Sequence, residues 1–148
     1  MAGLISPTDQ DKLRDAFAEI TRRVHLLFFT QTLDCETCLQ ARQIVDELPP
    51  LSDQIVVDEV NFVLDKDKVR QFGIDRVPAI AVTFEDAEGA QQDTRIRFLG
   101  TPAGYEFMSL VQAVLVAGGR PSLLSPATLA RLAAVDQPVS MQVFTTPT

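Results

Sequence analysis

Two cysteines three positions apart, Cys35 and Cys38, are the residues of this chain best suited to do chemistry. They are the only cysteines among its 148 residues. A pair at this spacing supports thiol–disulfide exchange, in which one thiolate attacks a partner's disulfide and the second cysteine resolves the mixed disulfide. We expect Cys35 to attack and Cys38 to resolve.

The residues around the pair predict a turn between a strand and a helix. An apolar run, residues 26–29, precedes it, and apolar residues at steps of three and four follow it, as one buried helix face requires. We therefore place Cys35 at or just before the first residue of this helix. The free amides and positive dipole end of a helix N-terminus stabilise a thiolate, which is the reactive form.

Three other interpretations of the pair are open. A structural disulfide closing so short a loop restrains the unfolded chain little. A zinc site normally needs four ligands, and the chain adds only His25, unless two chains each supply Cys35 and Cys38. Inert buried cysteines are the third, and the flanking Asp34 and Glu36 argue against burial. We interpret His25 as a structural or surface histidine, and we expect no metal and no cofactor.

Composition limits the classes of partner and the compartment. The net charge of −7 excludes a phosphate backbone or an anionic membrane as the expected partner. No apolar run is long enough to cross a bilayer, and the first residues lack the features of a signal peptide. We expect a cytoplasmic protein. In that reducing compartment a cysteine pair is more often catalytic or metal-binding than a structural crosslink.

The elements that must position the cysteines follow from periodicity and from turn residues. Strand 24–30, the cysteine helix and strand 54–62 form a βαβ unit, whose strands should be parallel. The sequence thus predicts an α/β fold with a central mixed sheet flanked by helices over residues 1–119. The remaining predicted elements are a helix from Ser6 to about Arg22, a short helix at 65–73, an antiparallel hairpin of strands 78–86 and 94–99, and a helix from about 105 that ends at Gly118.

Residues 120–148 predict an extra helix and an extra strand. Ser125 and Pro126 can start the helix, and residues 138–144 alternate as a strand does. A lone apolar strand needs a sheet edge to pair with. We expect that edge to belong to its own domain or to another subunit, which makes a homodimer through the C-terminal strand possible.

Pro78 opens the predicted strand 78–86, and its placement allows two interpretations. It can be a strand-start proline, which simply lacks a ladder donor. Alternatively, the Val77–Pro78 bond is cis and faces Cys35, so that the backbone of Val77 is free to pair with an extended substrate segment.

The order of these elements resembles the thioredoxin fold over nearly the whole chain. Within that superfamily the sequence is most similar to the N-terminal unit of the protein disulfide oxidoreductases, or glutaredoxin-like proteins, of thermophilic archaea and bacteria. These proteins carry two thioredoxin-like units, and residues 143–148 look like the first strand of the second one. The similarity is carried by residues 3–6, 72–78 and 98–107.

The resemblance implies that Cys35 is the nucleophile, Cys38 the resolver and Pro78 the cis proline, with Val77, Pro78, Glu36 and Thr37 contacting substrate. The chain departs from the common motif, since Glu36 and Thr37 replace Gly-Pro between the cysteines. A carboxylate beside Cys35 opposes thiolate formation, which favours a reducing couple.

A second departure is that the buried acid of thioredoxins has no counterpart, because Leu27, Phe28 and Phe29 stand on the preceding strand. Asp34, Glu36 or water would have to replace it as the proton shuttle. Glutathione would need cations near the cysteines, and only Arg76 and Arg42 are candidates.

We therefore expect a thiol–disulfide oxidoreductase acting on protein disulfides and recharged by a thioredoxin-reductase-type enzyme or a second unit. The alternative is a catalytically weak binding module, in which the cysteines switch the affinity of a groove around Val77 and Pro78.

Overall fold

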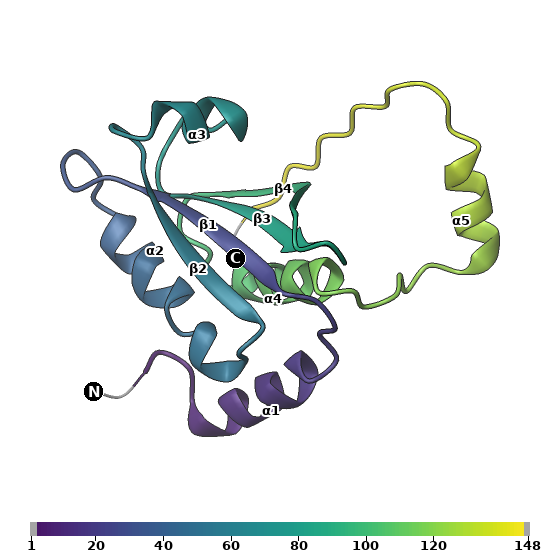
Figure 1. The fold of residues 1–148 in the computed structure, drawn as a ribbon, viewed down its shortest axis with the longest axis horizontal. Coiled ribbons are helices and arrows are strands. Elements are labelled where there is room, and N and C mark those ends of the chain that lie inside the picture. Colours follow the sequence, from purple (N-terminus) through teal and green to yellow (C-terminus); the bar gives the residue numbers. More distant parts are fainter. Residues whose placement is uncertain (1–2, 147–148) are drawn as a thin grey trace.

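A four-stranded mixed sheet forms the centre of the computed structural model, which describes residues 3–146 (Figure 1). The strand order is β2-β1-β3-β4. β1 is parallel to β2 and antiparallel to β3, and β3 is antiparallel to β4. The predicted βαβ unit and hairpin are thus confirmed. The strands are β1 (Val24–Thr30), β2 (Ile55–Asn61), β3 (Ala79–Glu85) and β4 (Gln91–Leu99).

Helices cover both faces of the sheet. Side chains of β1 alternate between the two faces and therefore enter two separate cores, of unequal size. Leu26 and Phe28 enter the larger core, against α1, α2 and α4. Leu27 and Phe29 enter a smaller core on the other face, against α3 and the segment after it. The helices are α1 (Pro7–Phe17), α2 (Cys38–Val45), α3 (Lys66–Gln71), α4 (Tyr105–Ala117) and α5 (Pro126–Ala133), with a short 3-10 helix η1 (Pro49–Leu51).

The first helix is shorter than predicted. It ends at Phe17 rather than near Arg22. The chain then turns towards β1, and the N–H of Thr21 donates to the carbonyl of Gly118 at 2.9 Å. This bond ties the segment before β1 to the end of α4, so these residues leave the helical path.

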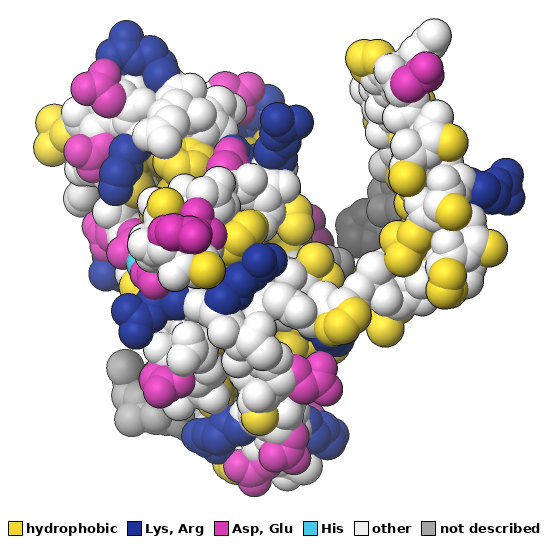
Figure 2. Space-filling view, turned by 45° about the vertical axis from the view of Figure 1, so that its right-hand side comes forward, with side chains coloured by type: hydrophobic (Ala, Val, Ile, Leu, Met, Phe, Trp, Pro, Cys, Tyr) yellow, Lys and Arg dark blue, Asp and Glu magenta, His cyan; other side chains and the backbone are white. Residues whose placement is uncertain are grey.

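The C-terminal arm, residues 120–146, follows α4, and its helix α5 stands away from the body, residues 3–119 (Figure 1 and Figure 2). It contains α5, which confirms the predicted extra helix. The strand predicted at 138–144 does not form within residues 3–146, where these residues extend without pairing to the sheet. That residues 120–148 begin a second thioredoxin-like unit stays a prediction, and residues 1–2 and 147–148 lie outside the described part of the chain.

No helix within residues 3–146 is long and apolar enough to cross a membrane.

Candidate active site

The cysteine turn leaves the C-terminal end of β1, one of the two strands with neighbours on both sides. Residues 31–37 form the turn. The side-chain amide of Gln31 donates to the backbone carbonyl of Asp34 at 3.3 Å, and Asp34 has a positive φ of 55°. A positive φ is uncommon outside glycine, and Asp is one of the residues that tolerates it. The turn is mostly exposed and follows an interior strand of the sheet.

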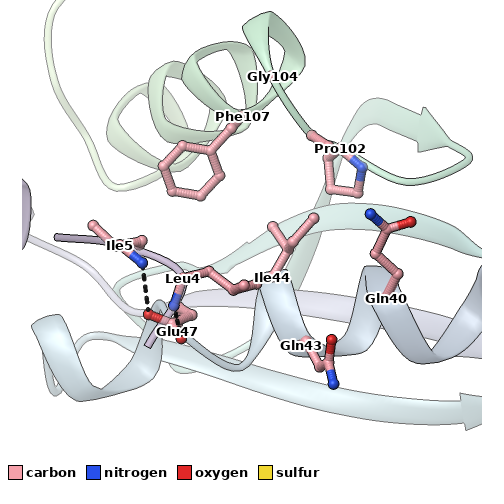
Figure 3. Close-up of a pocket in the computed structure, with 10 residues that line it drawn as sticks. Leu4, Ile5, Gln40, Gln43, Ile44, Glu47, Pro102, Gly104 and Phe107 are labelled. Carbon is pink, nitrogen blue, oxygen red and sulfur yellow. Dashed lines mark hydrogen bonds between the residues drawn. The ribbon is translucent and has the colours of Figure 1, made fainter. Parts of the chain in front are cut away.

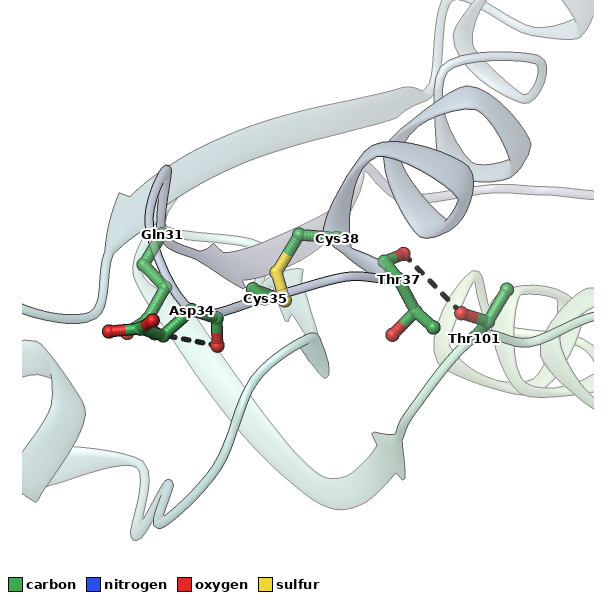
Figure 4. The surroundings of a disulfide bond; sticks show 6 residues. All are labelled: Gln31, Asp34, Cys35, Thr37, Cys38 and Thr101. Atoms are coloured by element: carbon green, nitrogen blue, oxygen red, sulfur yellow. Dashed lines mark hydrogen bonds between the residues drawn. A yellow bond between two sulfur atoms is a disulfide. The ribbon is translucent and has the colours of Figure 1, made fainter.

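Cys35 and Cys38 are joined by a disulfide, with their Cα atoms 5.5 Å apart (Figure 4). The two sulfurs differ in access. Cys35 is half-buried, whereas Cys38 is 4% exposed and belongs to the core. An incoming partner can therefore reach Cys35 more easily than Cys38.

α2 begins at Cys38, which corrects the prediction that Cys35 lies at or next to the first helical residue. The helix starts late because the carbonyl of Thr37 accepts the first helical hydrogen bond, from the N–H of Ala41 at 3.0 Å. Cys35 lies three residues ahead, in the turn. Its sulfur nevertheless meets the helix start through the bond to Cys38, where backbone N–H groups have no helical acceptor.

The segment before β3 lies at the same end of the sheet as the turn, because Ala79 pairs with Phe29 of β1. The Val77–Pro78 peptide bond is cis. The carbonyl of Pro78 accepts from the N–H of Gly100 at 2.8 Å. Within residues 3–146, the backbone N–H and carbonyl of Val77 make no hydrogen bond. These two groups therefore have no hydrogen-bond partner in the described part of the chain, although Val77 is half-buried.

Thr101, which the sequence prediction did not include, touches the cysteine turn. Its hydroxyl donates to the carbonyl of Thr37 at 3.5 Å (Figure 4). The resemblance over residues 98–107 marked this loop but not this contact. Glu36 and the side chain of Thr37 are exposed beside the disulfide.

A pocket of about 260 Å³ opens beside the cysteines, on the β2 side. Arg42 lines it, and its guanidinium pairs with Glu59 and with Asp46. The other candidate cation, Arg76, pairs with Asp75 at 2.8 Å. Both arginines thus already have carboxylate partners, which does not favour a site for the carboxylates of glutathione. The other lining residues are Thr30, Gln31, Thr32, Leu39 and Asn61.

The strand under the turn is apolar, as predicted. Leu27, Phe28 and Phe29 are at most 1% exposed. No carboxylate of β1 therefore lies beneath the sulfurs, and that Asp34, Glu36 or water transfers the proton stays a prediction.

His25 lies at the opposite end of β1 and bridges two strands. Its Nδ1 is 2.6 Å from Asp58 of β2, and its Nε2 is 2.7 Å from Glu85 of β3. Burial lowers the pKa of His25, but the hydrogen bonds and charges of Glu85 and Asp58 raise it more, so the net pKa lies above its usual value. This is the structural role predicted for His25. Among residues 3–146, no group of three or more such side chains is placed to hold a metal ion.

A separate hollow of about 400 Å³ lies between α2 and the start of α4 (Figure 3). Ile44, Pro102 and Phe107 form its apolar walls. Leu4 closes one side, where its N–H donates to Glu47 at 2.8 Å. The cysteines do not line this hollow.

No protein-family model matches the chain. The chain is 37% identical over 79 residues to the AhpF protein of the alkyl hydroperoxide reductase of Xanthomonas campestris pv. phaseoli. That match covers 53% of this chain and 12% of that protein. The sequence prediction did not anticipate this similarity.

Solved structures extend the similarity to most of the chain. The alkylhydroperoxide reductase protein AhpF of Enterococcus faecalis superposes with a TM-score of 0.76 and 27% identity, over 88% of this chain and 60% of that one. A protein disulfide oxidoreductase from Aeropyrum pernix superposes with a TM-score of 0.69 and 26% identity, over 87% and 54%. This chain therefore spans little more than half the length of these chains.

The predicted fold and the predicted similarity to protein disulfide oxidoreductases are confirmed. The chain is a thioredoxin-like protein with a Cys-X-X-Cys pair close enough to form a disulfide, similar in sequence and structure to disulfide oxidoreductases and to the AhpF proteins of alkyl hydroperoxide reductase.

Proposed function

We propose that this chain is a protein-disulfide oxidoreductase that works through Cys35 and Cys38. The observation that carries the proposal is the unequal access of two bonded sulfurs: Cys35 is half-buried at the surface turn, and Cys38 is 4% exposed. Exchange needs one sulfur that partners reach and one that they do not. The likeness to a protein disulfide oxidoreductase at 26% identity supports the same chemistry.

The reaction begins with the reduced pair. The Cys35 thiolate attacks one sulfur of a substrate disulfide, whose S–S bond breaks and whose other sulfur leaves as a thiolate. The Cys38 thiolate then attacks the Cys35 sulfur of the mixed disulfide and expels the second substrate thiolate. Two electrons have passed to the substrate, and the Cys35–Cys38 disulfide remains.

Substrate docking uses the rim around Cys35. The unpartnered N–H and carbonyl of Val77 can pair with an extended substrate segment. The hydrogen bond from Gly100 to Pro78 fixes the backbone next to Val77. Glu36 and Thr37 are exposed next to the sulfurs and can contact the same segment. Main-chain pairing gives little sequence preference, which suits an enzyme acting on varied protein disulfides.

We place the chain on the reducing side, in the cytoplasm, with a reductase-type electron donor. Glu36 next to Cys35 disfavours the thiolate and so favours a reducing couple. Two similar proteins are named as parts of a reductase, which supports a reductase-linked donor. We also propose self-association through the C-terminal arm.

A second function, a weakly catalytic binding module switched by oxidation, is favoured by one observation. The strand beneath the sulfurs carries Leu27, Phe28 and Phe29 and no acid, so proton transfer during exchange has no buried relay. This alternative predicts slow turnover and a partner whose affinity changes when the pair is oxidised. Pulldowns under oxidising and reducing conditions measure that difference.

Insulin reduction with dithiothreitol tests the first proposal. Cys35→Ser should lower the rate by at least about 1,000-fold, because the nucleophile is lost. Cys38→Ser is the matched control: it keeps the attacking thiol and should accumulate a mixed disulfide visible by mass spectrometry. A Cys35→Ser variant as active as the parent rules the proposal out.

The reduction potential of the pair separates the two functions. Equilibration with a glutathione or dithiothreitol buffer should give a reduction potential in the reducing part of the thioredoxin-like range, about −270 mV. A pair that reduces insulin no faster than free dithiothreitol, yet binds a partner only when oxidised, supports the binding module instead.

A further inference from the structure

The tail, residues 138–144, has the pattern of a strand but no strand beside it. Its apolar residues Val139, Met141 and Val143 alternate with Ser140 and Gln142. All five are exposed, and Val143 is 86% exposed. Residues that alternate in this way bury one side when they join a sheet. The tail therefore lacks a sheet edge.

The helix that leads to the tail also lacks a partner. α5 has eight residues and buries none of its side chains. Leu129 and Leu132 are 43% and 53% exposed. An isolated helix of this length is marginal in water, so it needs packing to be stable. The whole arm thus presents apolar surface of a kind that marks an interaction site (Figure 2).

The body has two sheet edges, and β4 is the protected one. Its pairing with β3 is irregular between Ala81 and Thr83, and Arg95 has a positive φ of 66°. Asp93 and Arg97 form an ion pair at 2.6 Å along the same strand. The break in register between Ala81 and Thr83 is a device of the kind that keeps an edge strand from pairing.

β2 is the open edge. Its seven residues pair with β1 without a register shift. The N–H of Phe62 donates to Thr30 of β1 at 2.9 Å, so alternate backbone groups along β2 face β1 and those between face outward. Val57 and Glu59 are outward residues, and within residues 3–146 their backbone N–H and carbonyl groups make no hydrogen bond. Two consecutive outward residues of β2 therefore offer a free ladder.

Charge favours the arm as the occupant of this edge. Residues 43–65, which include β2, contain six acids and no Lys or Arg. The tail has no charged residue, so it can lie along this acidic edge without repulsion. The arm as a whole carries Arg120 and Arg131 against one acid, Asp136.

We propose that the tail of one copy adds as a strand to the β2 edge of a second copy, and that the two copies exchange tails. Each copy carries one strand without an edge and one edge without a strand, so reciprocal exchange satisfies both and closes with two-fold symmetry. The hollow between α2 and α4 has apolar walls but does not supply the backbone partners that a strand requires. The proposal is independent of the redox chemistry, and its failure leaves disulfide exchange standing.

The exchange brings a second chain to the redox pocket. Glu59, an outward residue of β2, also lines the pocket that contains Cys35 and Cys38. A tail paired along β2 therefore borders that pocket with side chains of the partner copy.

The molecular mass and the amide hydrogen exchange of the full chain test the proposal. Both are measured in the presence of a reductant, which prevents disulfide-linked dimers. Light scattering over a wide range of protein concentration should show a monomer–dimer equilibrium. In the dimer the amides of Val57 and Glu59 should exchange at least about tenfold more slowly than in the monomer. Outward amides of β4 should not change.

Paired tail variants locate the contact. Met141→Lys with Val143→Lys charges the apolar side and should give a monomer with fast exchange at Val57 and Glu59. Ser140→Lys with Gln142→Lys adds the same charge to the polar side, without repulsion from the acidic edge, and should remain a dimer. All four positions are exposed, so neither variant should unfold the body. A monomer at every concentration, a dimer that survives the first variant, or slowed exchange on β4 instead of β2 overturns the proposal.

Discussion

Helices α1 and α5 begin in the same way and end in different surroundings. Both start with serine and proline, and each serine side chain accepts a hydrogen bond from the N–H three residues later, at 3.2 Å. α1 buries Leu13 and Phe17 in the larger core. α5 buries nothing. The same local signal therefore begins a helix whether or not the helix contributes to the fold.

The difference shows that capping and packing contribute separately to the stability of a helix. A cap satisfies backbone donors within one turn of the helix. Packing decides whether that helix is coupled to the global stability of the chain. The body is coupled through its core and through the His25 bridge, whereas the arm bonds to α4 through Arg120 and buries no side chain of α5.

Removing a large side chain from each helix gives the largest expected contrast. Phe17→Ala should lower the free energy of unfolding by about 3–5 kcal/mol, because Phe17 is 2% exposed and its loss leaves a cavity. Leu129→Ala should change it by less than about 0.5 kcal/mol in a dilute sample. Urea unfolding followed by circular dichroism measures both. Equal losses for the two variants would mean that α5 packs against the body.

The His25 bridge makes the body sensitive to pH and the arm insensitive. Because the pKa of His25 is raised in the folded chain, its contribution is complete below its unfolded pKa of about 6.5 and is lost as pH rises through the folded pKa. His25→Gln should cost about 1–2 kcal/mol at low pH and flatten this dependence. Urea unfolding at a series of pH values tests this.

The control for the pH series is the arm itself. The Cα chemical shifts of Leu129 and Leu132 should not follow the titration of His25. A parent protein that gains stability as pH rises from about 6.5 would contradict the bridge, since its sign is the opposite.

Removing the two caps gives the smallest contrast. Ser6→Ala should lower the free energy of unfolding by about 1 kcal/mol, because α1 is part of the core. Ser125→Ala should leave urea unfolding unchanged and reduce only the helical chemical shifts of α5. Loss of global stability in the second variant would again place α5 against the body.

Local sequence was sufficient to predict an element where the residues of that element or of one turn determine it. The apolar run before Cys35 identified the central strand, and the step pattern after Cys38 identified α2. Gly118 marked the end of α4. Each of these signals is a property of neighbouring residues, so the pattern along the chain contains it.

Features that depend on distant residues were missed or displaced. The alternation at 138–144 predicted a strand, but a strand forms only beside a partner, which the described residues 3–146 do not provide. The start of α2 shifted because Thr37, not Cys35, begins the helical hydrogen bonds. The Thr101 contact and the two partners of His25 join residues far apart in sequence, and periodicity carries no trace of them.

The reactive turn follows β1, an interior strand of the sheet, and this has a consequence for inactivation. Fraying at the termini, or melting of the arm, leaves β1 in place between β2 and β3. The sulfur geometry should therefore persist until the sheet itself melts. Loss of turnover on heating should coincide with cooperative unfolding of the body, and partly frayed molecules should still turn over.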